Sequence, residues 1–94
     1  MMPALALDEL STALAGLAGW QEVDGTLRKV YLLGSFVAAI ELVNRVADLA
    51  EAAGHHPEIA ISYNRVTFSL VTHDEGGITQ KDVDLATQIE GAAV

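Results

Sequence analysis

The chain holds its three histidines, His55, His56 and His73, close together in the sequence. The first two are adjacent, between a glycine and a proline, and the third lies in the segment "VTHDEGGIT". An imidazole has an unperturbed pKa of about 6.5, so it can donate or accept a proton at neutral pH, and it also binds metals. The cluster therefore has three interpretations: a metal site, an acid/base site, or polar residues in ordinary loops.

The spacing of the histidines gives little support to a metal site. Three histidines and a carboxylate such as Glu51 could bind zinc. Adjacent histidines in an extended segment diverge, however, and the sequence lacks the His-x-x-x-His and His-Glu-x-x-His patterns. It has no cysteine, which excludes thiolate ligands. We therefore expect no metal. For acid/base chemistry the histidines need not point to one common position, because donor and acceptor can act on different atoms. The spacing alone does not decide between an acid/base site and ordinary loop residues.

Composition narrows the classes of partner. The net charge of −8 repels phosphate backbones and anionic membranes, so we expect neither nucleic-acid nor membrane binding. No apolar run approaches the roughly 18 residues of a membrane span, and the N-terminal segment does not resemble a signal peptide, so we expect a cytoplasmic protein. We expect residues 1–94 to form one domain. Its apolar share of 51% favours self-association.

The first half of the chain has the pattern of a helix, a hairpin and a second helix. Leucines at helical spacing predict a helix over residues 7–17, with Asp8 as its cap. The pair Asp24-Gly25 between two strand-like segments predicts a hairpin. The segment 36–53 is the clearest amphipathic helix. Its two adjacent apolar stripes indicate either one broad core face or packing on a sheet together with contact to another chain.

The second half has the pattern of a second hairpin and a last helix. Residues 58–63 and 66–72 read as strands joined by a tight turn at Asn64-Arg65. The last helix starts at Thr79 as its cap, and Asp82, at the third helical position after it, faces back to that cap. The order helix, hairpin, helix, hairpin, helix predicts an α+β fold, with a four-stranded antiparallel sheet and three helices on one face.

The predicted elements place all three histidines at element ends, where binding groups often collect. His55 and His56 follow the long helix, and His73 follows the last strand. Glu51 lies four residues before His55, one turn behind it if the helix continues. Taken singly, Glu51 is more readily explained as part of a solvated helix face, and Asp82 as part of a helix cap.

The segment "AEAAGHHPEIAISYNRVTFSLVTHDEGGITQKDVDLATQIE" resembles the signature of the pterin-4a-carbinolamine dehydratases. That family typically has Ala-Glu, then His-His-Pro-Glu, Tyr-Asn, Thr-His, Gly-Leu-Thr, and an aspartate before the final helix. The pair Gly19-Trp20 also resembles the family, and the likeness spans about residues 17–90. It implies the α+β fold expected above and dehydration of 4a-hydroxy-tetrahydropterin to quinonoid dihydropterin, without metal or organic cofactor. The pterin product would return to the aromatic amino acid hydroxylases.

The resemblance also implies roles for particular residues. His55, His56 and His73 would line the pterin pocket, with His55 and His73 as acid and base and His56 chiefly binding. Glu51 would orient or polarise His55. Asp82 would lie near the pocket while it caps the last helix. The implied substrate-binding and supporting residues are Glu51, Asp82, Pro57 and Thr72.

Two departures and one alternative function accompany the resemblance. Ile59 stands where the family commonly has tryptophan, and Lys81 where arginine is frequent, so the charge is kept but the planar guanidinium is lost. Family members form dimers and dimers of dimers, which implies a homodimer or homotetramer. Some serve as dimerisation partners of a transcription factor, and degenerate relatives assist assembly of the carbon-fixing enzyme. Because all three histidines are kept together with Glu51 and Asp82, we favour the enzyme over such a binding or assembly protein.

Overall fold

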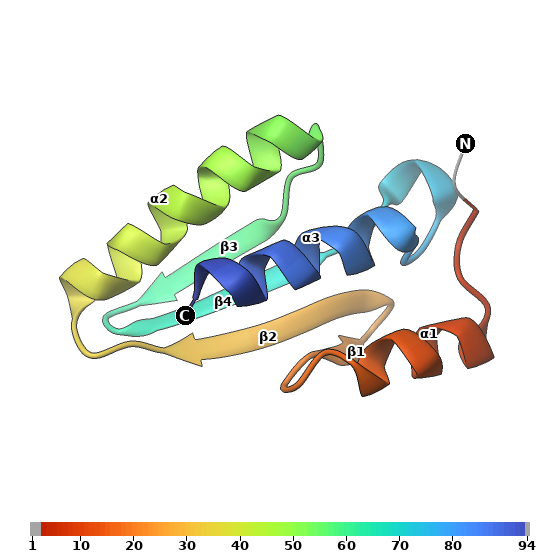
Figure 1. Cartoon of the computed structure of the whole chain (residues 1–94), viewed down its shortest axis with the longest axis horizontal. Helices are drawn as coiled ribbons and strands as arrows, with labels where there is room; N and C mark the ends of the chain where they lie inside the picture. Colours follow the sequence, from red (N-terminus) through yellow and green to blue (C-terminus); the bar gives the residue numbers. More distant parts are fainter. Residues whose placement is uncertain (1–2, 94) are drawn as a thin grey trace.

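The computed structural model describes residues 3–93. Its elements follow the predicted order of helix, hairpin, helix, hairpin and helix (Figure 1). A short 3-10 turn, η1, precedes the last helix. The elements are α1 (Leu7–Ala15), β1 (Gln21–Val23), β2 (Thr26–Leu32), α2 (Phe36–Ala53), β3 (Glu58–Ser62), β4 (Arg65–Leu70), η1 (His73–Glu75) and α3 (Gln80–Ala92).

The two hairpins form one antiparallel sheet in the order β1-β2-β4-β3. The central strands β2 and β4 pair from Leu27 opposite Leu70 to Leu32 opposite Arg65. Because side chains alternate between the faces of a strand, Val66, Phe68 and Leu70 of β4 all point to one face, and all are fully buried there. This arrangement of sheet and helices confirms the predicted α+β fold.

The core lies between the sheet and helices α2 and α3, which run side by side over it (Figure 1). Leu42, Val46 and Ala50 of α2 are buried at helical spacing, and Ala39 lets the helix approach the strands closely. At the start of α2, however, Val37 remains 63% exposed. The apolar surface of α2 is therefore wider than the core it covers.

Three turns and caps follow from local chemistry. The hairpin between β1 and β2 turns at Asp24 and Gly25, whose φ angles of 51° and 82° are those of a left-handed turn. The hydroxyl of Ser35 accepts a hydrogen bond from the backbone N–H of Ala38 at 3.0 Å, which caps α2. At the start of α3 the bond runs the other way, because the carboxylate of Asp82, the third helical residue, accepts from the N–H of the cap residue Thr79 at 2.9 Å.

Two local predictions are wrong. The residue that precedes α1 is Ala6, and Asp8 lies inside the first turn; the Glu9 carboxylate accepts the Ala6 N–H instead, at 2.9 Å. The second hairpin turns at Tyr63 and Asn64, because Arg65 already belongs to β4. Tyr63 has a φ of 55°, which is rare for an aromatic residue. None of the helices in residues 3–93 is long and apolar enough to cross a membrane.

Candidate active site

The histidine pair owes its position to the way α2 ends. Gly54 adopts a left-handed conformation with φ of 64°, and its N–H donates to the Glu51 carbonyl at 3.2 Å. The N–H of His55 reaches further back, to the Ala50 carbonyl at 3.1 Å. This closure turns the chain out of the helix. Because Pro57 disfavours helical geometry in the residue before it, His56 continues as extended chain into β3.

His55 lies against a buried carboxylate. Its Nε2 is 2.5 Å from Oδ1 of Asp82, and the His55 side chain is only 11% exposed. Asp82 is completely buried. Its other oxygen, Oδ2, accepts hydrogen bonds from the hydroxyl of Thr72 and from the backbone N–H of Thr79, both at 2.9 Å. The same carboxylate therefore caps α3 and contacts a site histidine.

The prediction that Glu51 lies against His55 is wrong. Oε1 of Glu51 is 3.2 Å from Nε2 of His56, and both side chains are exposed, at 79% and 60%. The prediction assumed that helical spacing continued to His55, but the left-handed turn at Gly54 ends it. A contact this exposed is weak and is screened by salt.

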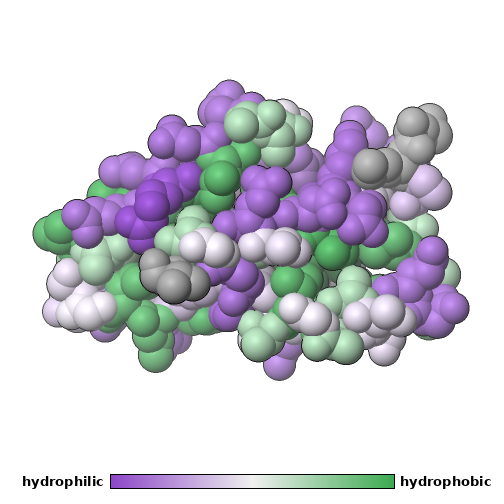
Figure 2. All heavy atoms as spheres, in the orientation of Figure 1, coloured by the Kyte–Doolittle hydropathy of each residue, from purple (hydrophilic) through white to green (hydrophobic). Residues whose placement is uncertain are grey.

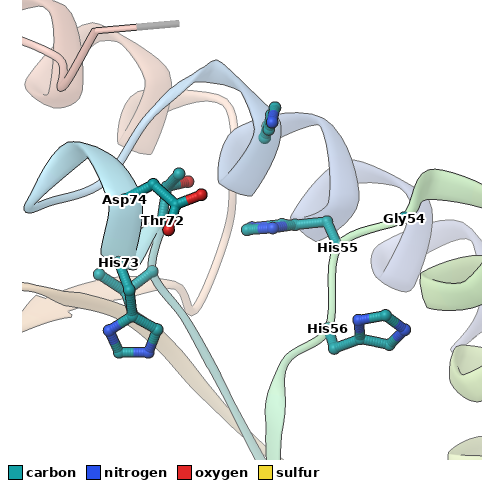
Figure 3. A pocket seen from close by; sticks show the side chains of 8 residues that line it. Gly54, His55, His56, Thr72, His73 and Asp74 are labelled. Atoms are coloured by element: carbon teal, nitrogen blue, oxygen red, sulfur yellow. The ribbon is translucent and has the colours of Figure 1, made fainter. Parts of the chain in front are cut away.

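The three histidines line one cavity of about 250 Å³. In Figure 3 the His55 ring extends toward Thr72 and Asp74, whereas the His56 ring is turned away from them. His73, the first residue of η1, is exposed and approaches from the end of β4. The cavity is lined by Gly54, His55, His56, Val71, Thr72, His73, Asp74 and Lys81.

The histidines converge on a cavity without converging on one point. Within residues 3–93 no three His, Asp or Glu side chains are grouped closely enough to hold a metal ion. His55 and His56 each face a different carboxylate, one buried and one exposed. Such an arrangement can present separate proton donors and acceptors to different atoms of one bound molecule.

The other predicted site residues occupy different places. Thr72 is buried, and its hydroxyl belongs to the network behind His55. Pro57 does not line the cavity, and it acts through the backbone of His56. Lys81 lines the cavity, whereas Ile59 lines a separate hollow on the sheet with Arg28. The departure at Ile59 therefore lies outside the histidine cavity.

Sequence reasoning missed the contribution of Thr79 to the site. Thr79 was predicted as a helix cap only, yet its hydroxyl lies 2.8 Å from that of Thr72 and joins the network behind His55. The cavity residues Gly54 and Val71 were also missed as lining residues. The signal available for Thr79 was the capping box itself, because its acidic member, three residues after Thr79, is Asp82.

The fold and the cavity together define a class of small α+β proteins that carry a histidine-lined pocket beside a four-stranded sheet. The chain belongs to the pterin-4a-carbinolamine dehydratase family, because the family model described as pterin 4 alpha carbinolamine dehydratase matches residues 3–92. This confirms the resemblance found in the sequence.

Individual relatives agree with the family assignment. A protein of Thermosynechococcus vestitus, provisionally named pterin-4-alpha-carbinolamine dehydratase, is 48% identical over all of this chain and 99% of its own. One of Herpetosiphon aurantiacus with the same provisional name is 53% identical over 95% of this chain and 93% of its own.

Two solved structures resemble the fold. The crystal structure of a transcriptional coactivator/pterin dehydratase from Brucella melitensis has a TM-score of 0.93 and 34% identity, covering 97% of this chain and 99% of that one. A pterin dehydratase-like protein, identified as a RuBisCO assembly factor in the alpha-carboxysome, has a TM-score of 0.65 and 23% identity, covering 79% of this chain and 86% of that one. The second likeness bears on the fold alone.

Proposed function

We propose that this protein dehydrates 4a-hydroxy-tetrahydropterin to quinonoid dihydropterin and so recycles the pterin cofactor of aromatic amino acid hydroxylases. The observation that carries the proposal is the placement of His55, His56 and His73 on one cavity, with His55 against the buried Asp82. Membership in the dehydratase family supports the same reaction class. The enzyme is then a hydro-lyase.

The reaction needs one proton acceptor and one proton donor. The acceptor takes the proton from a ring nitrogen of the substrate, and that nitrogen's electron pair forms the C=N bond. As the C=N bond forms, the C–O bond at position 4a breaks, and the oxygen leaves as water with the donor's proton. An imidazole can serve either role at neutral pH. We assign the two roles to His55 and His73, with no metal or organic cofactor.

His56 has a binding role in this proposal. It lines the cavity at its exposed rim, and its ring contacts the exposed Glu51 at 3.2 Å. The His56 ring is turned away from Thr72 and Asp74 (Figure 3) and lies against Glu51, which suits contact with the substrate more than proton transfer beside His55 and His73. Lys81 adds a cationic group to the same cavity.

We further propose that the protein acts as a homodimer or homotetramer in the cytoplasm, with a small pterin as its ligand and no binding to nucleic acid or membranes. Every residue of the edge strand β3 is exposed, so its outer backbone groups are open to pairing. Apolar surface also gathers where β2 ends and α2 begins, at the left of Figure 2, and includes Leu32, Phe36 and Val37. The net charge of −8 supports the last two exclusions.

A binding or assembly role without catalysis is the alternative. Its support is the likeness to the assembly factor, which concerns the fold only. A stopped-flow assay with freshly generated 4a-hydroxy-tetrahydropterin separates the two. We expect the protein to accelerate dehydration well above the spontaneous reaction measured in parallel. No acceleration at stoichiometric protein would contradict the enzymatic proposal and leave the binding role.

A further inference from the structure

Behind His55 lies a continuous chain of hydrogen bonds among buried side chains. The hydroxyls of Thr72 and Thr79 are 2.8 Å apart, and the Thr72 hydroxyl is 2.9 Å from Oδ2 of Asp82. Oδ1 of the same carboxylate lies 2.5 Å from Nε2 of His55. Thr79 and Asp82 are completely buried, and Thr72 is 7% exposed. In such surroundings each donor and acceptor must be satisfied within the network.

The direction of each bond in this chain follows from counting hydrogens. An ionised carboxylate only accepts hydrogen bonds, so the Thr72 hydroxyl donates its one hydrogen to Asp82. The Thr79 hydroxyl must therefore donate to Thr72. Its own oxygen is free to accept, and it does so from the backbone N–H of Lys81 at 3.2 Å. The hydrogen-bond acceptor of each of the two hydroxyls is therefore fixed.

The same counting fixes which ring nitrogen of His55 carries a hydrogen. The positive end of helix α3 and the Thr79 N–H stabilise Asp82 as an anion, so its Oδ1 needs a donor. Among residues 3–93, the only side-chain or backbone group that bonds to Oδ1 is Nε2 of His55, at 2.5 Å. Nε2 therefore holds a hydrogen, and in neutral His55 the lone pair lies on Nδ1.

We propose that Thr72 and Thr79 are positioning residues, which act through Asp82 to hold His55 as the tautomer with hydrogen on Nε2. Nδ1 is then the atom at which His55 exchanges a proton with the substrate. This role of Nδ1 rests on the proposed dehydratase function, whereas the tautomer does not. Neutral His55 then enters the reaction as the proton acceptor. It takes the ring-nitrogen proton on Nδ1, and the imidazolium that forms is paired with Asp82. His73 donates its proton to the leaving oxygen.

The other two histidines lack such a support. The carboxylate that His56 contacts, Glu51, is exposed and lies 3.2 Å from the ring. His73 has no side-chain hydrogen bond to any other residue in the described part of the chain and is exposed. Of the three rings, His55 alone is fixed in both orientation and tautomer by buried groups, which is the property that a base of defined geometry requires.

Nitrogen-15 NMR of histidine-labelled protein tests the tautomer directly. The His55 signals are assigned by their loss in His55→Gln, and are read at a pH where His55 is neutral. We expect a protonated Nε2 and an unprotonated Nδ1 in the unmodified protein. A protonated Nδ1 would overturn the proposal whether or not the protein proves to be a dehydratase.

Substitutions at Thr72 test the positioning role. Thr72→Val keeps the shape but removes the hydroxyl, so the tautomers should become mixed and kcat should fall about tenfold, as when outer partners of a functional histidine are removed. KM should stay within about twofold, because the substrate contacts remain. Thr72→Ser restores the hydroxyl and should restore both readouts.

Thr67→Val is the matched control, because it makes the same change in the same chain region but on the uncovered face of the sheet. It should alter neither the tautomer nor kcat. An unchanged tautomer and kcat in folded Thr72→Val would overturn the positioning role. A changed tautomer with unchanged kcat would overturn Nδ1 as the exchange atom. An unmodified protein that carries the expected tautomer but accelerates no dehydration would overturn the proposed function and uphold the tautomer.

Discussion

The indole Nε1 of Trp20 donates a hydrogen bond to Oε1 of Glu90 at 3.0 Å, across 70 residues of sequence. The same oxygen accepts from Nζ of Lys29 at 2.5 Å and from the hydroxyl of Tyr31. These contacts join the segment before β1 and strand β2 to the last turns of α3. Asp82 lies in the first turn of that helix, so the cluster fixes one end of α3 while the site uses the other.

The Glu90 cluster should make stability sensitive to acid. Burial alone would raise the pKa of Glu90, but hydrogen bonds from Lys29, Tyr31 and Trp20 outweigh it and hold that pKa below its ordinary value. The stabilisation is therefore complete above the ordinary pKa of about 4.3 and is lost as the pH falls through the lower folded value. Thermal melts in steps from neutral to acid pH should show a smaller acid loss for Glu90→Gln than for the unmodified protein.

Glu41→Gln, on the exposed face of α2, is the control for this substitution and should keep the full acid dependence. An acid loss in Glu90→Gln as large as that of the unmodified protein would contradict the prediction.

Tyr31 should make stability sensitive to alkali. Burial raises the pKa of the Tyr31 hydroxyl well above its usual range, and the hydrogen bond to Glu90 and the negative charge of Glu90 raise it further. The folded state thus holds the proton more tightly, and stability present below the ordinary pKa of about 10 is lost as the pH rises above it. Tyr31→Phe should remove part of this loss and cost about 1–2 kcal/mol at neutral pH, because a hydrogen bond to a charged group disappears.

Urea unfolding at neutral and alkaline pH measures both effects. Tyr63→Phe is the matched control, since Tyr63 is 69% exposed. Equal unfolding free energies for Tyr31→Phe and the unmodified protein at neutral pH would rule out a stabilising role of the hydroxyl.

A side chain at Gly19 should destabilise the folded protein. Its φ is 83°, and a Cβ there would lie 2.8 Å from Cε of Lys29. Lys29 cannot move aside freely, because its Nζ donates to Glu90 and to the Ala18 carbonyl. Gly19→Ala should therefore cost about 1–2 kcal/mol of unfolding free energy. Gly34→Ala has open space and no left-handed backbone, so it should be nearly neutral in the same denaturant titration. Equal stability of the two variants would contradict the strain argument.

The order of elements could be predicted because it depends on local signals. Periodicity marks the helices, Asp24-Gly25 marks the first turn, and the spacing from Thr79 to Asp82 marks the last cap. The second turn was misplaced by one residue because Tyr63 takes a left-handed φ of 55°, which propensity disfavours.

The partners of the histidines could not be predicted from spacing. His55 meets Asp82 across 27 residues only because the end of α2 packs beside the start of α3. Spacing along a helix pointed instead to Glu51, but Gly54 ends that helix before His55. Glu51 consequently contacts His56.

Self-association should appear in solution. The open edge of β3 and the exposed apolar side chains at the start of α2 favour a second copy of the chain. Light scattering over a dilution series should give a dimer or tetramer of the 9.9 kDa chain. A monomer alone at micromolar concentration would contradict this prediction.

His56→Ala should weaken substrate binding more than it slows the chemistry. His56 is exposed and contacts the exposed Glu51, so KM should rise while kcat changes little. Steady-state kinetics over a range of pterin concentrations separate the two constants. A large fall in kcat at unchanged KM would contradict the binding role and move His56 into the proton-transfer step.

The catalysed rate of folded His73→Ala tests the proposed dehydratase most directly. His73 is exposed, so removing it should leave the melting temperature nearly unchanged. His55→Ala is a less direct test of catalysis, because it leaves the buried Asp82 without its hydrogen-bond partner. After subtraction of the spontaneous reaction, the rate of His73→Ala should fall by roughly 10²–10⁴, or about 3–5 kcal/mol of barrier. An unchanged rate in a variant with an unchanged melting temperature would contradict proton transfer by His73.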